Sequence, residues 1–248
     1  MNATFTLLEM RRITRDWTGM FFTAVLPAFF FLVFGATVDA KGESIGNGNV
    51  AMYVMISMAA YGAVTATTSI GGNAAVERQQ GWGRQLGLTP LADSSYIAMK
   101  ALIAMTVAAV PILLTFTLGA ATGARGSGQA WALSALLCLV GSSVFAVYGL
   151  LVGTAFRSEA AVGAASGSMV IFAFLGNLFI PLSGAILTFA KFTPLYGYAA
   201  LARYPLTEGY LADGSHDPLW VPVLNVVAWL TIFGTLAVLL VRRGRERQ

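Results

Sequence analysis

Apolar stretches of about 20 residues recur along this chain, separated by short polar segments. An α-helix needs about 20 apolar residues to cross the roughly 30 Å hydrocarbon core of a bilayer. Of the residues, 57% are hydrophobic and 10% are charged, whereas soluble domains carry about 25% charged residues. The sequence therefore predicts an all-α membrane protein, one transmembrane domain over residues 1–248, with six spans at about 20–38, 50–72, 96–118, 130–156, 160–180 and 219–241.

The first 19 residues have a different pattern, in which charged side chains alternate with apolar Phe5, Leu8, Ile13 and Trp17. This pattern predicts an amphipathic interfacial helix over residues 1–19, with its basic residues at the lipid headgroups. A signal peptide is the competing interpretation, since Val38-Asp39-Ala40 loosely mimics a cleavage site. The apolar run before it is longer than the roughly 7–15 residues of a signal-peptide core. We therefore interpret this run as the first span and expect a kink at Pro27.

The basic residues predict the orientation in the membrane, because cytoplasmic loops carry an excess of Lys and Arg. With both termini in the cytoplasm, the inner side holds eleven basic residues and the outer side holds four, which are Lys41, Arg125, Lys191 and Arg203. The last two lie in residues 181–218, expected to be a long outer loop, and re-entry of residues 184–189 into the membrane stays open. We predict a multi-pass protein of the cell (inner or plasma) membrane with cytoplasmic termini.

Motifs for catalysis and cofactor binding are missing from the sequence. No G-x-x-x-x-G-K-[ST] loop is present to hold ATP, and no H-E-x-x-H motif is present to hold zinc. Cys138 and His216 are the single cysteine and histidine, too few for a metal cluster built from these residue types. Almost no ionisable side chain lies inside the spans, where ion-coupled transporters need one. We expect no enzyme activity, no cofactor in this chain and no nucleic-acid partner, so any energy source belongs to another subunit.

The polar segment 77–95, between the second and third spans, is longer and more charged than a turn requires. Gly81 and Gly83 interrupt the helix that leaves the second span, and Pro90 ends the piece that follows. The apolar stripe between these breaks consists of Trp82, Leu86 and Leu88. On the residues alone, the segment is either a docking site for another protein or a basic amphipathic loop on anionic headgroups.

This segment resembles the cytoplasmic motif of ABC transporter type-2 permeases, and most closely that of the drug- and antibiotic-exporting branch. The resemblance rests on Glu77-Arg78-Gln79-Gln80-Gly81-Trp82, Arg84-Gln85-Leu86, Leu88-Thr89-Pro90-Leu91, Tyr96 and Lys100. Two positions depart from the family pattern: Gln79 replaces a commoner acidic residue, and Trp82 stands where a small polar residue is frequent. The order of interfacial helix, six spans and basic tail resembles the family along the whole chain.

The resemblance implies a permease subunit of an ATP-driven exporter, with a cytoplasmic coupling helix in the polar segment. In that family the coupling helix sits in a groove of a separate P-loop ATPase subunit, which binds the ATP and Mg²⁺. The residues that carry over to this role are Glu77, Arg78, Trp82, Arg84, Leu86, Thr89 and Pro90. A second copy of the permease, or a paralogue, completes a two-fold assembly.

Two spans carry the side chains that we expect along the substrate route. They are Met58, Tyr61, Thr65 and Thr68 on one helix face of the second span, and Phe172, Asn177 and Phe179 in the fifth span. The resemblance implies that the second and fifth spans of two paired permeases enclose the route. Mixed hydroxyl, amide and aromatic groups suit an amphiphilic molecule. The alternative is that the polar groups only hydrogen-bond neighbouring helices.

Gly163 and Gly167 form a G-x-x-x-G pattern at the start of the fifth span, which permits close approach of another helix. That helix belongs either to the second permease of the pair, which is the use we favour, or to the same subunit.

We expect this chain to export an amphiphilic small molecule, such as a drug, an antibiotic or a lipid-like compound. Within the same family, the alternative is export of a lipid-linked polysaccharide or a lipid. The alternatives from other classes are an intramembrane enzyme and a membrane scaffold without transport activity.

Overall fold

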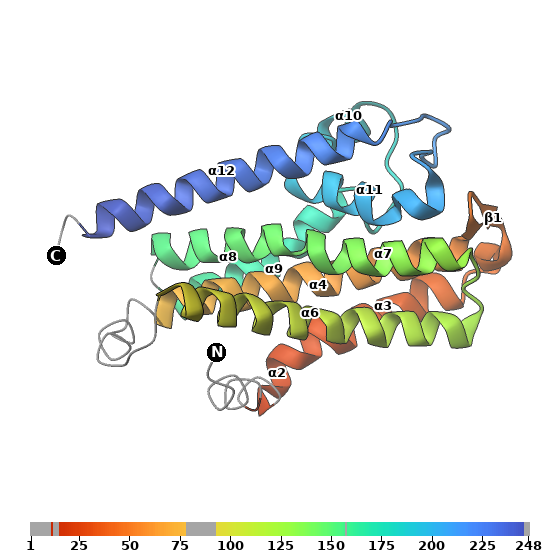
Figure 1. The fold of residues 1–248 in the computed structure, drawn as a ribbon. Helices are drawn as coiled ribbons and strands as arrows, with labels where there is room; N and C mark the ends of the chain where they lie inside the picture. The colour runs from red at the N-terminus through yellow and green to blue at the C-terminus, as the bar shows by residue number, and fades with distance from the viewer. Residues whose placement is uncertain (1–10, 12–14, 78–92, 157, 246–248) are drawn as a thin grey trace.

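The chain forms a bundle of long helices that run roughly along one direction (Figure 1). The computed structural model describes residues 11, 15–77, 93–156 and 158–245. The helices are α2 (Trp17–Met20), η1 (Phe21–Val25), α3 (Leu26–Phe31), η2 (Leu32–Ala36), η3 (Asp39–Gly42), α4 (Val50–Glu77), α6 (Asp93–Thr122), α7 (Gly128–Gly141), α8 (Ser143–Phe156), α9 (Glu159–Leu175), α10 (Gly184–Ala190), α11 (Pro194–Thr207) and α12 (Trp220–Arg245). Helices bond their own backbone groups, as a bilayer requires, and the prediction of an all-α membrane protein is confirmed.

One end of the bundle carries a short antiparallel hairpin, β1 (Ser44–Ile45) and β2 (Gly48–Asn49). We call this end of the bundle the hairpin end. The backbone N–H of Asn47 donates to Leu206 O at 2.8 Å, and Asn49 Oδ1 accepts from the Arg125 N–H at 2.9 Å. The opposite end, where α4 stops, is called the Glu77 end. Figure 1 shows α3 running toward the hairpin end and α12 running away from it. Which end faces the cytoplasm stays a prediction.

The central helix is α4, which is buried along most of its length. It is rich in small residues, which let neighbouring helices approach closely. Gly71 packs on the Ala146 carbonyl of α8, and Gly149 of α8 packs on the Thr68 carbonyl, so closely that a Cβ on either glycine would collide with backbone. The G-x-x-x-G pattern of Gly149 and Gly153 therefore serves the contact between α4 and α8.

The first span is an irregular helix in which the π-helical segments η1 and η2 alternate with α2 and α3. Pro27 lies in the first turn of α3, directly after η1, and it has no N–H to bond the Thr23 carbonyl. That carbonyl faces Gly62 of α4, which also lies against Pro27 and against Pro111 of α6. A Cβ at Gly62 would lie 2.6 Å from Pro111 Cβ and 2.9 Å from Thr23 O, so a glycine is required here. The predicted interfacial helix over residues 1–19 lies mostly outside the described residues.

The predicted fourth span is a helix interrupted at Ser142, between α7 and α8. Side chains of other helices bond the carbonyls at this break: Thr67 Oγ1 of α4 donates to Ser142 O at 2.8 Å, and the Tyr198 hydroxyl of α11 donates to Cys138 O at 2.8 Å. An interrupted helix is tolerated in a membrane when neighbours bond the freed groups in this way. The Cys138 thiol is free and buried among these contacts.

Five helical stretches of the described chain are long and apolar enough to cross a membrane, at residues 17–36, 50–77, 99–122, 128–156 and 220–240. The predicted fifth span is shorter, since α9 has 17 residues, a length of about 26 Å at 1.5 Å per residue. Gly176 ends α9, and Asn177 follows with a left-handed φ of 59°. Six complete spans are therefore not confirmed.

Residues 181–218 are not the long loop that the sequence predicts. They contain α10 and α11, and α11 packs against α4, α7 and α12. Pro194 stands in the first turn of α11, where proline favours a helix start. Residues 184–189, for which re-entry stayed open, belong to α10, whereas α11 is the piece that enters the bundle. The loop prediction was wrong because α11 carries two prolines, an arginine and several tyrosines, and so lacks a continuous apolar run.

Candidate functional site

The four residues predicted on one face of the second span are buried in α4. The exposed fractions are 1% for Met58, 3% for Tyr61, 5% for Thr65 and 0% for Thr68. Thr65 Oγ1 donates to the Tyr61 carbonyl one turn earlier, whereas Thr68 Oγ1 has no hydrogen-bond partner among the described residues. In this conformation the face packs against other helices of the same subunit.

Tyr61 of α4 and Phe179, just after α9, lie together within one subunit, and their place on a substrate route stays a prediction. The ring centroids are 4.9 Å apart in an edge-to-face arrangement. Phe179 also contacts Phe30 of α3 at 5.8 Å and Phe174 of α9 at 5.1 Å. We call these four rings the aromatic cluster. It joins the first span, α4 and the end of α9 through contacts worth about 0.5–1.5 kcal/mol per pair beyond their area burial.

The other two residues predicted for the fifth span lie outside this cluster. Phe172 meets Tyr148 of α8, with ring centroids 6.2 Å apart. Asn177 is 3% exposed, and its Oδ1 accepts from the Leu182 N–H at 2.7 Å. The Asn177 carbonyl accepts from Arg203 Nη1 at 2.9 Å. Asn177 thus shapes the turn that ends α9.

Gly163 and Gly167 lie on an exposed face of α9. A Cβ added to either glycine would have no described atom within 4 Å. Close packing within the subunit therefore occurs at Gly149 and Gly153, and the face of Gly163 and Gly167 is open to lipid or to a second subunit.

Glu77 is the predicted coupling residue that the structure describes. Outside the described residues lie Arg78, Trp82, Arg84, Leu86, Thr89 and Pro90. The Glu77 carboxylate forms an ion pair with Lys100 of α6, with Oε2 and Nζ 2.6 Å apart. The side chains are 18% and 10% exposed, respectively, so water screens the pair less than it screens a surface pair. The pair joins the two helices that flank residues 78–92.

A cavity of about 120 Å³ lies beside this ion pair, between α2, η1, α4 and α6. We call it the Glu77 cavity. Apolar side chains such as Met20 and Ile70 line it together with polar residues, which are Asp16, Thr23, Ser69, Asn73, Glu77 and Lys100. A lining of both kinds suits the polar head of an amphiphile.

Arg203 is a buried cation that the sequence analysis placed in an outer loop. It lies on α11 with 2% of its surface exposed. Its Nη1 donates to the Tyr53 hydroxyl at 2.7 Å, to Ser57 Oγ at 3.4 Å and to Asn177 O at 2.9 Å. The guanidinium also lies 4.6 Å from the Tyr53 ring centroid. The run 194–207 could have indicated this site, because it is mostly apolar with one charge, and an ionisable residue within a membrane helix is a functional candidate.

Asp217 holds the ends of α10 and α11 together near the hairpin end. Its Oδ1 lies 2.5 Å from Lys191 Nζ, and its Oδ2 accepts from the Tyr196 hydroxyl at 2.5 Å. Asn225 of α12 donates to the Lys191 and Thr193 carbonyls. Both carboxylate oxygens of Asp217 are therefore engaged by residues of the same subunit.

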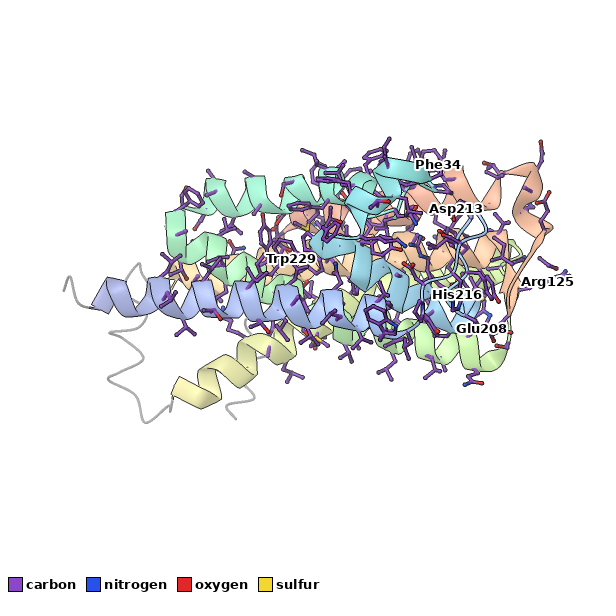
Figure 2. The ribbon with its side chains drawn as sticks, turned by 90° about the horizontal axis from the view of Figure 1, so that it is seen from above. Phe34, Arg125, Glu208, Asp213, His216 and Trp229 are labelled. Atoms are coloured by element: carbon purple, nitrogen blue, oxygen red, sulfur yellow. The ribbon has the colours of Figure 1, made fainter. Side chains whose placement is uncertain are left out.

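His216 lies in an exposed loop at the hairpin end, and Figure 2 shows it near Glu208. Its Nε2 is 3.1 Å from the Glu208 carbonyl oxygen, and its ring centroid lies 4.8 Å from that of Tyr210, with the two ring planes tilted by 56°. Hydrogen bonds from the Ser215 hydroxyl and N–H hold the pKa of the Asp213 carboxyl below its usual value. These contacts agree with a solvated loop histidine.

Long apolar helices around a buried central helix, with large apolar side chains on the outer faces, define a multi-pass helical membrane protein. The chain is similar to a protein of Bacillus subtilis (strain 168) named "Putative transport permease YvfS", with 25% identity over 245 residues, 97% of this chain and 96% of that protein. No protein-family model matches the chain. The likeness over nearly the full length of both chains supports a transport permease.

Proposed function

We propose that this chain is the permease subunit of an ABC exporter that moves an amphiphilic small molecule out of the cell. The observation that carries the proposal is the full-length likeness to a transport permease, together with the motif in residues 77–95. A separate P-loop ATPase subunit binds the ATP and Mg²⁺, and a second permease, identical or paralogous, completes the pair. The Glu77 end and both termini then face the cytoplasm.

The ion pair of Glu77 and Lys100 supports a mechanical role for the segment between them. Because the pair ties the end of α4 to α6, a push by the ATPase on residues 78–92 moves both helices together. Movement of α4 then changes the contact between Tyr61 and Phe179, which lie 4.9 Å apart. ATP binding acts by biasing the equilibrium between two such arrangements.

The Glu77 cavity supports an amphiphile as the transported molecule, because polar and apolar groups line it together. We propose that the molecule enters here from the inner leaflet and passes the aromatic cluster toward the hairpin end. A lipid-linked polysaccharide or a lipid is the alternative cargo. The likeness to a transport permease favours transport over an intramembrane enzyme or a scaffold.

Purification of the tagged full-length chain from native membranes in mild detergent tests this function. We expect a P-loop ATPase to accompany the wild-type permease, and Trp82→Ala to lose the ATPase while staying in the membrane. Lys41→Gln, a charge change at the exposed hairpin end, is the matched control and should keep the ATPase. A wild-type permease that repeatedly purifies alone would contradict the proposal.

A further inference from the structure

We propose that Arg203 forms a binding site for one acidic group, a carboxylate or a phosphate, of the exported molecule. The site lies toward the hairpin end, where α4, α11 and the turn after α9 meet at the guanidinium. The inference deepens the proposed function and rests on it, because α4 and α9 carry the residues of the predicted route.

The charge of Arg203 lacks a counter-charge in the described part of the chain. No described carboxylate forms an ion pair with Arg203, and its contacts with Tyr53, Ser57 and Asn177 are to neutral groups. Asp217 lines a small cavity together with Arg203, but other residues already bond both of its carboxylate oxygens. A buried charge is costly unless an opposite charge compensates it, so an anion is the partner that this site lacks.

Two hydrogen-bond donors at the site have no acceptor among the described residues. Arg203 Nη2 is buried and has no hydrogen-bond partner among the described residues. The Tyr53 hydroxyl accepts from Arg203 Nη1, and a phenol that accepts can still donate its own hydrogen. A guanidinium N–H and a phenol O–H both donate to the oxygens of a carboxylate or a phosphate.

A cavity of about 10 Å³ adjoins these donors, and Tyr53, Arg203 and Thr207 are among the residues that line it. This volume holds about one water-sized atom, the size of a single oxygen of the acidic group. Leu211 and Pro222 also line the cavity, and they offer an apolar surface to the rest of the molecule. The cavity therefore admits one oxygen of an acidic group, and the rest of the molecule lies outside it.

Isothermal titration of the purified full-length permease, in a neutral detergent, tests the site. The probes are octyl phosphate and octyltrimethylammonium, which share a chain and differ in the charge of the head. We expect a Kd for octyl phosphate about tenfold lower than for octyltrimethylammonium. Arg203→Gln should remove this difference, and Arg125→Gln, a change of an exposed arginine at the same end, should keep it.

Tyr53→Phe is the second variant, because it deletes only the phenol hydroxyl and tests the site even where Arg203→Gln does not fold. It should weaken octyl phosphate binding about fivefold. Equal affinity of the wild type for the two probes would overturn the proposal. So would a preference for octyl phosphate that stays unchanged in both Tyr53→Phe and Arg203→Gln. Arg203 would then have only a structural role in holding the helices together.

Competition separates the exported molecule from a lipid as the source of the acidic group. Dihexanoyl phosphatidylglycerol is expected to displace octyl phosphate poorly. If dihexanoyl phosphatidylglycerol displaced octyl phosphate at about one tenth of the octyl phosphate concentration, the site would bind a lipid headgroup. That result would overturn the role of the site in export. All of these measurements use the permease alone, so their failure is distinguishable from failure of the ATPase to co-purify.

Discussion

The Glu77 carboxylate and the Lys100 ammonium lie 2.6 Å apart, although 23 positions separate the two residues in the sequence. The pair therefore holds the end of α4 beside α6, the two helices that flank residues 78–92 in the sequence. Removal of one member of a partly buried pair leaves the other charge without this partner. The free energy of unfolding then falls by more than the intact pair contributes to it.

Lys100→Gln is therefore expected to lower the free energy of unfolding by on the order of 3 kcal/mol. Thermal unfolding of the purified permease in detergent measures this change. The exchanged pair, Glu77→Lys with Lys100→Glu, should recover most of the stability that the single Lys100→Glu change removes. An exchanged pair no more stable than Lys100→Glu alone would show that the tie between α4 and α6 is not electrostatic.

Gly149→Ala is expected to destabilise the subunit by about 1–3 kcal/mol. The added methyl group would collide with the Thr68 carbonyl, which belongs to the backbone of α4 and cannot move aside cheaply. Gly163→Ala is the matched control, because its methyl group meets no described atom within 4 Å. Thermal unfolding that ranks the two variants equally would contradict this packing of α4 on α8.

Gly167→Leu tests the proposed pairing of two permeases. The side chain should leave the unfolding temperature of the subunit nearly unchanged, since the space around Gly167 is open. If α9 meets the second permease at this face, the bulk of leucine should reduce the crosslinked dimer in native membranes. Undiminished crosslinking would place the second permease elsewhere, or assign this face to lipid.

Thr67 and Thr68 form a natural pair for testing the route, because both are 0% exposed and only one is bonded. Thr67→Val should cost about 1 kcal/mol, since Thr67 Oγ1 donates to Ser142 O. Thr68→Val should cost little stability, because its hydroxyl has no described partner.

Transport assays then separate the two roles of these hydroxyls. If Thr68 contacts the substrate in another conformation, Thr68→Val should reduce transport while the unfolding temperature stays close to the wild-type value. Normal transport in that variant would remove Thr68 from the route.

Features that depend on neighbouring residues in the sequence could be predicted well. The apolar runs locate the helices because their length and polarity are local properties, and α4 and α12 cover the second and last predicted spans. Arg203 was misplaced because α11 is neither long nor apolar enough to be read as a membrane helix, and only its packing against α4, α7 and α12 shows that it is buried.

The sequence by itself determined that this chain is a helical membrane protein with a charged segment between its second and third predicted spans. Only the tertiary structure decided which helix faces meet. Gly149 with Gly153 and Gly163 with Gly167 have the same spacing, yet the first pair packs on α4 and the second faces outward. The physical reason is that a glycine pattern permits close approach of any helix, while the partner that uses it depends on the arrangement of the whole bundle.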